Sequence, residues 1–361
     1  MIDDMFVFNA VAHAYNMSDD NIPNSHYANR LRDGLVHLHM RQGAFAMDGA
    51  GQCTDWPIEV LARSLFLESD CDMAATHTLR LDSWFHDGLC RREKTVEAVN
   101  RWPQRFVGYV GVDPTRGLEV CLDDLDEQLD EMPSAVGLKL YPSQVNPHRS
   151  WRMDDESLAF PLFERARKRG IRTVAVHKAA PFGPVPIAPF RVDDIDLAAD
   201  AFPDMAFEII HAGLAFTDET AMLLALFPNV YANFEVTSAL INTNPAQFET
   251  VMGTFLRQGG SEKIIYSDGS MVLHSQPILE SFRNYRLKDE TLEKFNIPQI
   301  TDQDIANILG LNYANILGID VDQAKAAIAD DEFSRERART GLQEPFSNWR
   351  RHLADTKLEV A

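Results

Sequence analysis

The sequence predicts an α/β protein of a single domain, a (β/α)8 TIM barrel. Short, nearly continuous apolar runs recur along the chain, which is typical of strands buried on both faces in a parallel sheet. Amphipathic stretches separate these runs at intervals of roughly 30 residues, which is the rhythm of βαβ units. The first run lacks the glycine-rich turn that an open dinucleotide-binding sheet carries. A chain of 361 residues is long enough for one such barrel and its core.

The predicted strands begin near the N-terminus and continue through the middle of the chain. They are rich in valine, isoleucine and phenylalanine, which favours strands over short buried helices. Eight parallel strands favour a closed barrel over an open sheet. The expected ranges are 6–13, 73–79, 106–112, 135–141, 171–177, 205–211, 230–236 and 263–268.

Helices are expected between the strands. Leucines recur at helical spacing in 118–132, and 160–170 ends with a cationic turn followed by glycine. The stretch 217–229 opens on Thr217, which we expect to be its N-cap. A further helix over 245–260 begins with proline and ends with glycines.

Two segments depart from this rhythm. Residues 16–70 form an insertion after the first strand, with one helix near 25–42 and another near 56–68. In a barrel this insertion covers the mouth of the active site, so we expect a helical lid. The C-terminal tail is helical over about 300–355. Because no proline-, glycine- or serine-rich linker interrupts the chain, we expect one domain over 1–361.

Composition narrows the partners and the compartment. The formal net charge of −20 repels nucleic acid and anionic membrane surfaces, although a small anionic substrate stays compatible with it. The N-terminus resembles no signal peptide, and no apolar run approaches the ~20 residues of a membrane span. The four cysteines form no CxxC pair, so we expect reduced thiols and a cytoplasmic protein.

Four of the predicted strands end on a side chain that can bind a metal ion or move a proton. They are the strands that lead to His13, His177, His211 and Asp268. The C-terminal ends of barrel strands open on one face, where active sites of this fold lie. Alternation along each strand places His177 and Lys139 toward the inside of the barrel.

These strand ends carry a series of motifs that resembles a known family. FNAVAH, KLYP, AVHK, IIHAG and YSDGS occur in this order and resemble the amidohydrolase superfamily over roughly residues 1–320. The similarity is greatest to the branch of aminocarboxymuconate-semialdehyde decarboxylase, aromatic-acid decarboxylases and related hydrolases. It implies that His13 and His177 are metal ligands and that His211 contacts substrate or bound water. It implies that Asp268 is a ligand that also serves as a base.

The sequence departs from the family pattern at two of these motifs. The first strand of the family commonly ends in His-x-His. Here the sequence reads His13-Ala14-Tyr15, or Val11-Ala12-His13 in the other register, so one histidine is missing. Tyr15 can replace the missing ligand, face the substrate or pack as an aromatic side chain. The decarboxylases often carry proline after the histidine of the fifth strand, whereas this chain has Lys178.

Other side chains near the strand ends are candidates for binding a substrate. Lys139 can be a carbamylated bridging ligand, hold a substrate carboxylate or pair with a carboxylate of the barrel. Lys178 can attract an anionic substrate, and Glu235 and His77 can bind substrate or be salt-bridged.

A second His-x-His motif, His37 and His39, is expected to lie on a helix. There the side chains at i and i+2 point about 200° apart and do not share a metal ion.

The candidate ligands define the predicted chemistry. Two imidazoles and one carboxylate leave open positions on a divalent metal, and nitrogen and oxygen ligands suit zinc or manganese. Such an ion lowers the pKa of bound water toward ~7. The first hypothesis is therefore a metal-dependent hydrolase of a small carboxylated compound. A metal-dependent decarboxylase and a metal-free binding protein are the alternatives, and the resemblance allows a homodimer.

Overall fold

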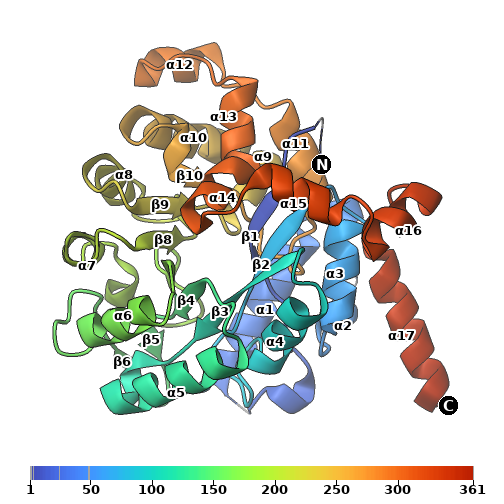
Figure 1. Cartoon of the computed structure of the whole chain (residues 1–361), viewed down its shortest axis with the longest axis horizontal. Helices are drawn as coiled ribbons and strands as arrows, with labels where there is room; N and C mark the ends of the chain where they lie inside the picture. The colour runs from blue at the N-terminus through green and yellow to red at the C-terminus, as the bar shows by residue number, and fades with distance from the viewer. Residues whose placement is uncertain (1, 3, 24, 48, 361) are drawn as a thin grey trace.

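Eight parallel strands form one sheet in the computed structural model, which describes residues 2, 4–23, 25–47 and 49–360. Each strand pairs with its neighbour in the order β1-β2-β3-β4-β7-β8-β9-β10 (Figure 1). The bounds are β1 (Phe8–Ala12), β2 (Met73–His77), β3 (Phe106–Gly111), β4 (Gly137–Leu140), β7 (Thr173–His177), β8 (Ala206–Ile210), β9 (Val230–Asn233) and β10 (Ile264–Ile265).

The sheet closes on itself between its first and last strands. The Ala10 amide donates to Tyr266 O (3.1 Å), and the Gly269 amide donates to Val11 O (3.2 Å). The predicted barrel is therefore confirmed, and all eight strands lie inside the predicted ranges. A short antiparallel pair, β5 (Ser143–Gln144) and β6 (Arg149–Ser150), follows β4 and was not predicted.

Helices lie around the strands as the βαβ pattern predicts (Figure 1). One prediction is wrong in detail: Thr217 is the first residue of its helix, and Phe216 in the left-handed conformation (φ 53°) is the N-cap. The surrounding helices are α4 (Arg92–Arg101), α5 (Leu118–Glu131), α6 (Ala159–Lys168), α7 (Ile195–Ala201), α8 (Thr217–Leu226), α9 (Leu240–Thr243), α10 (Pro245–Gln258) and α11 (Ser275–Arg283).

The insertion after β1 contains the two helices expected there. They are α1 (His26–Met40) and α3 (Ile58–Phe66), with the short α2 (Gly49–Gln52) between them. His39 fixes the end of α1, because its Nδ1 donates to Val272 O (2.7 Å) while its Nε2 accepts from the Met47 amide (2.7 Å). His39 therefore joins the insertion to the loop after β10.

The C-terminal tail closes the other end of the barrel and then crosses its outside. The Tyr266 amide donates to Ile308 O (2.9 Å), and a Cβ on Gly310 would lie 2.3 Å from Phe6 O, so only glycine fits there. Trp349 of the last helix stacks on Trp56 of the insertion, with ring centroids 4.6 Å apart. The tail helices are α12 (Asp289–Phe295), α13 (Asp302–Ala306), α14 (Asn312–Leu317), α15 (Val321–Ile328), α16 (Glu332–Thr340) and α17 (Ser347–Val360), with a π-turn at Asn307–Leu311 before α14.

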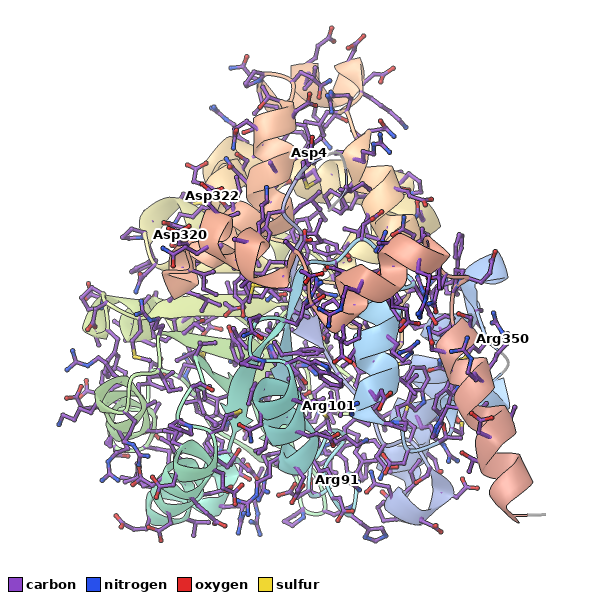
Figure 2. The ribbon with its side chains drawn as sticks, turned by 45° about the vertical axis from the view of Figure 1, so that its right-hand side comes forward. Asp4, Arg91, Arg101, Asp320, Asp322 and Arg350 are labelled. Carbon is purple, nitrogen blue, oxygen red and sulfur yellow. The ribbon has the colours of Figure 1, made fainter. Side chains whose placement is uncertain are left out.

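Several charged side chains lie on the outer elements. Asp320 and Asp322 lie at the start of α15, and Arg350 lies on α17, all outside the ring of strands (Figure 2). Among the described helices, none has both the length and the apolarity needed to cross a membrane.

Candidate active site

Four polar side chains meet at the C-terminal end of the barrel. His13 follows β1, His177 ends β7, His211 follows β8 and Glu235 lies two residues beyond β9. Each is at most 9% exposed. His177, His211 and Glu235 line a cavity of about 150 Å³. This is the face of the barrel on which the sequence places the site.

His177 and His211 form a pair in which the ring nitrogens have defined roles. His177 Nε2 lies 3.0 Å from Ala180 O, and His211 Nδ1 lies 2.9 Å from Glu235 O. Because a carbonyl oxygen only accepts, both of these nitrogens carry hydrogen and donate. The other two nitrogens, His177 Nδ1 and His211 Nε2, face each other at 3.1 Å. In neutral rings both of these inner nitrogens hold lone pairs. A proton that enters the pair therefore has two possible acceptors.

The surroundings keep these imidazoles neutral. Burial, together with the neighbouring His211, holds the pKa of His177 well below its ordinary value. Burial also lowers the pKa of His211, although the Glu235 carboxylate acts in the opposite direction. At neutral pH both rings are therefore available as bases.

Glu235 is the anionic centre of the cluster. One carboxylate oxygen lies 3.4 Å from His13 Nε2, and the other lies 3.7 Å from both Lys139 Nζ and His211 Nε2. The second oxygen, Oε2, has no hydrogen-bond partner among the described residues. Burial alone would raise the pKa of Glu235, but Lys139, His211 and His13 outweigh it and hold the pKa well below its ordinary range. Of the roles expected for Lys139, the structure supports pairing with a barrel carboxylate.

His13 and His77 form the floor beneath Glu235. Their rings meet edge to face with centroids 5.3 Å apart, and His77 stacks on Tyr109 at 4.0 Å. His77 Nε2 donates to Ala10 O (3.0 Å). Burial lowers the pKa of both histidines, and for His13 the neighbouring Glu235 carboxylate acts in the opposite direction.

Two tyrosines and an apolar wall complete the cavity. Tyr15 lies edge to face with His13 (5.1 Å), and Tyr141 stacks on His177 (4.9 Å). Leu31 of α1 belongs to the wall, so the insertion contributes to the lining of the cavity. The apolar lining residues are Leu31, Leu35, Leu81, Leu89, Ala180, Pro181, Phe182, Leu214, Val236 and Val272.

The backbone is strained where three strands enter the site. Ala179, His211 and Val236 have φ angles of 57°, 64° and 63°, which non-glycine residues rarely adopt. Such strain persists where the surrounding structure holds it and often marks functional positions. Here it turns the chain after β7, β8 and β9 so that His177, His211 and Glu235 meet.

Asp268 lies in a different environment from the one expected. Its Oδ1 accepts from Asn9 Nδ2 (2.7 Å), the Ser270 amide (2.9 Å) and Ser270 Oγ (2.8 Å). Its Oδ2 accepts from Tyr266 OH (2.7 Å). Both oxygens of Asp268 therefore accept hydrogen bonds from residues of the β1 and β10 segments. The two expected metal ligands lie elsewhere, with His13 beside Glu235 and His177 beside His211.

The residues present do not fit the ligand set that the sequence suggested. Across the described part of the chain, no group of three or more His, Cys, Asp or Glu side chains is arranged to hold a metal ion. The three expected ligands each lie beside a different residue: His13 beside Glu235, His177 beside His211 and Asp268 beside Asn9. Zinc or manganese binding by these residues stays a prediction.

Lys178 occupies a buried ion pair outside the cavity. Its Nζ donates to Asp194 Oδ2 and to Pro189 O, both at 2.8 Å, and both charged side chains are 2% exposed. In this structure its charge is therefore paired within the loop that follows β7, and contact of Lys178 with a substrate stays a prediction.

Tyr141 is a functional candidate to which the sequence assigned no role. Alternation along the strand places it inward together with Lys139, two residues before it. The apolar wall from α1 was not assigned either, since it depends on how the insertion folds over the barrel.

Comparisons with known proteins agree with the fold. A family model described as Amidohydrolase matches residues 53–319. No curated protein matches the chain. An uncharacterized TIM-barrel protein from Bordetella bronchiseptica is similar, with a TM-score of 0.63 and 14% identity over 87% of this chain and 99% of that one.

Two aromatic-acid decarboxylases are also similar in structure. The 5-carboxyvanillate decarboxylase of Novosphingobium aromaticivorans, solved with bound manganese, has a TM-score of 0.53 and 12% identity over 88% of this chain and 98% of that one. The 2,6-dihydroxybenzoate decarboxylase of Rhizobium has a TM-score of 0.52 and 12% identity over 86% and 98%. At this level of identity the similarity concerns the fold.

Proposed function

The chain belongs to the amidohydrolase family, an enzyme family, and on this premise we propose that it hydrolyses a small organic compound in the cavity at the C-terminal end of the barrel. The observation that carries the proposal is the pair of inner imidazole nitrogens, His177 Nδ1 and His211 Nε2, which face each other at 3.1 Å. Both outer nitrogens donate to carbonyl oxygens, so the inner nitrogens hold the lone pairs that can take a proton from water.

The proposed reaction uses this pair as the general base. A water molecule attacks the carbonyl carbon of the substrate while one of its protons passes to an inner nitrogen of the pair. The carbonyl oxygen gains the negative charge. When the tetrahedral intermediate collapses, the bond to the leaving oxygen or nitrogen breaks, and the pair returns the proton to that atom. The products are a carboxylic acid and an alcohol or amine.

Glu235 supports the charged state of the pair. After proton transfer the two rings share a positive charge, and Glu235 Oε2 lies 3.7 Å from His211 Nε2. The carboxylate stabilises this imidazolium, and Lys139 keeps the carboxylate ionised before the transfer. In a buried site such charge interactions are stronger than in water.

Isotope incorporation tests the reaction class. Esters, lactones and amides are incubated in H₂¹⁸O with the enzyme, and we expect one ¹⁸O in the acid product. His177→Gln and His211→Gln should each lower kcat by about 100-fold or more, the usual range for loss of a general base. His352→Gln, on α17 and outside the cavity, is the matched control and should keep full activity.

Other outcomes identify the alternatives. Release of carbon dioxide without ¹⁸O in the product would support a decarboxylase, and ligand binding without turnover would support a binding protein. Metal analysis of protein purified without chelator tests the zinc or manganese prediction separately. A stoichiometric metal that is lost in His177→Ala would show that the histidine pair binds an ion.

A further inference from the structure

The loop that follows β10 forms one side of the cavity. Val272 of this loop belongs to the cavity lining and is buried. Near the start of the loop, Ser270 O accepts from the His13 amide (2.5 Å). Because His13 directly follows β1, this end of the loop is fixed to the barrel. The position of Val272 therefore depends on what holds the rest of the loop.

Residues at the end of α1 hold the middle of the loop. Val272 O accepts from His39 Nδ1 (2.7 Å) and from Gln42 Nε2 (3.0 Å). The other end of the Gln42 side chain, Oε1, accepts from the His274 amide (2.6 Å). The insertion therefore holds the loop on both sides of Leu273.

The His274 side chain extends this connection to Glu68, which lies between α3 and β2. His274 Nδ1 accepts from the Gln276 amide (3.2 Å), so Nε2 carries hydrogen and donates to Glu68 Oε2 (3.4 Å). Both side chains are completely buried. A buried carboxylate is costly unless donors surround it, so the position of Glu68 depends on its other hydrogen bonds.

Four more donors to Glu68 come from the C-terminal tail. Glu68 Oε2 accepts from the Phe346 amide (2.6 Å), and Oε1 accepts from the Asn348 amide (2.8 Å) and Asn348 Nδ2 (2.6 Å). Ser347 Oγ also donates to Oε1 (3.2 Å). The first amides of a helix have no partner within the helix itself. Glu68 therefore caps the start of α17 with the same carboxylate that binds His274.

An aromatic side chain of the tail packs against both histidines that hold the loop. The Phe346 ring lies edge to face with His39 (5.3 Å between centroids) and with His274 (4.9 Å). Phe346 and Trp349 are each 1% exposed. Farther along α17, residues 350–351 and 354–356 are exposed, and Arg350 points away from the barrel (Figure 2). The tail is thus anchored at the start of α17, beside the loop.

We propose that Glu68 is a positioning residue for the active site. Through His274 it couples the C-terminal tail to the loop after β10, and so keeps Val272 in the cavity wall. The groups proposed to move protons lie on β7 and directly after β8 and β9, so the coupling acts on the shape of the cavity. The inference goes beyond the proposed hydrolysis, and only its kinetic test rests on that reaction.

Hydrogen exchange measured by mass spectrometry tests the coupling without a substrate. Asn348→Ala removes one tail donor to Glu68 and leaves the sequence of the loop unchanged. We expect exchange to become about tenfold faster in residues 342–352 and also in 269–276, because a hydrogen bond to a charged group is lost. Glu68→Gln should have the same effect on both segments, since its amide group would place a donor opposite the tail or opposite His274.

Glu249→Gln is the matched control. Glu249 on α10 is 7% exposed and likewise holds the start of a helix, because it accepts from Thr291 Oγ1 of α12 (2.7 Å) and from Tyr285 OH (3.0 Å). The variant should lose stability as Glu68→Gln does. Exchange in 269–276 should stay within about twofold of wild type, because distant sites act independently.

Steady-state kinetics give a result that loss of stability alone would not produce. With a substrate found by isotope incorporation, Glu68→Gln should raise KM about tenfold and keep kcat within about threefold of wild type. The reason is that the wall of the cavity loosens while the proton-transfer groups stay in place. Glu249→Gln should change neither constant.

Each outcome supports or overturns the proposal. Faster exchange in the tail of Asn348→Ala without a change in 269–276 overturns it, and this variant decides alone if Glu68→Gln does not fold. Equal loosening of the loop in Glu249→Gln also overturns it, because general loss of stability would then be the cause. A large fall in kcat of Glu68→Gln with unchanged KM contradicts a positioning role. If tail and loop loosen together but no compound is hydrolysed, the coupling stands and the hydrolase proposal fails.

Discussion

Two buried glutamates on neighbouring segments of the barrel have opposite surroundings. Glu208 lies on β8, and all of its polar contacts are made: Oε1 accepts from Tyr109 OH (2.6 Å) and Thr173 Oγ1 (2.6 Å), and Oε2 accepts from Asn233 Nδ2 (2.8 Å). Glu235, beyond β9, has an oxygen that accepts no hydrogen bond from any described residue. Both side chains are fully or almost fully buried.

The pKa values of the two carboxyl groups differ in direction as well. Burial raises the pKa of Glu208, despite its three donors. For Glu235, Lys139 and two histidines outweigh burial and keep the group ionised. A buried polar group with complete hydrogen bonds holds the fold, whereas an unsatisfied, ionised group is poised to interact with a ligand. The barrel interior therefore has a structural end around Glu208 and a chemical end around Glu235.

The largest effect is expected for Glu235→Gln. The variant removes the charge that stabilises the protonated histidine pair, so kcat should fall by about 100-fold or more. It also leaves Lys139 buried without its partner, which should lower the free energy of unfolding by about 3–5 kcal/mol. Steady-state kinetics and urea unfolding measure the two effects.

A double variant distinguishes the two effects of Glu235. Glu235→Gln with Lys139→Met removes both charges and should regain most of the lost stability, because no unpaired charge remains. It should stay as inactive as the single variant. Recovery of activity together with stability would mean that Glu235 serves the fold, as Glu208 does.

Asp268→Asn comes next in size and tests the ligand and base role that the sequence predicts for this carboxylate. The structure places this carboxylate with Asn9, Tyr266 and Ser270, so it resembles Glu208 rather than Glu235. We expect a loss of about 1–3 kcal/mol in the free energy of unfolding, from one hydrogen bond disturbed in a buried network. Activity should stay within about tenfold of wild type. A loss of activity as large as that of Glu235→Gln would restore Asp268 to the chemistry.

The strands were predictable because burial on both faces leaves a direct pattern in the sequence. Each run from 6–13 to 263–268 contains its strand, and His177 and His211 follow from the strand ends. The roles of Asp268 and Glu235 were not predictable in the same way. They depend on which donors the neighbouring strands bring beside each carboxylate, such as Asn9 beside Asp268 and Lys139 beside Glu235. Those neighbours are set by the register of the barrel and not by local sequence.

Glu208→Gln should affect stability more than activity. The amide has only one acceptor oxygen, so it cannot accept from Asn233 Nδ2 and from the hydroxyls of Tyr109 and Thr173 as the carboxylate does. The cost should be about 1–3 kcal/mol in the free energy of unfolding, with kcat within about threefold of wild type. A larger change in kcat would contradict the assignment of Glu208 to the structural end.

The stability of the wild type relative to Glu208→Gln should depend on pH with a defined sign. The folded protein holds the Glu208 proton at a pKa above the ordinary value of 4.5, so folding binds a proton that the unfolded chain has released. The stability of the wild type should therefore fall as pH rises from 4.5 through the folded pKa. The Gln variant lacks this proton. The difference in Tm between wild type and variant should be largest near pH 4.5 and shrink at higher pH, as calorimetry can measure.

The smallest effect is expected for Tyr313→Phe, on α14 at the closed end of the barrel. Its hydroxyl lies 2.6 Å from Tyr109 OH, which also donates to Glu208. Loss of this one hydrogen bond should cost about 0.5–1.5 kcal/mol in urea unfolding, and kcat and KM should not change. The kinetic measurement also tests a coupling between the two ends, because the charges of Glu208 and Glu235 both raise the pKa of Lys139. A kinetic change in Tyr313→Phe would mean that the network below Lys139 tunes the site above it, so the two ends of the barrel interior would have to be treated as one electrostatic unit.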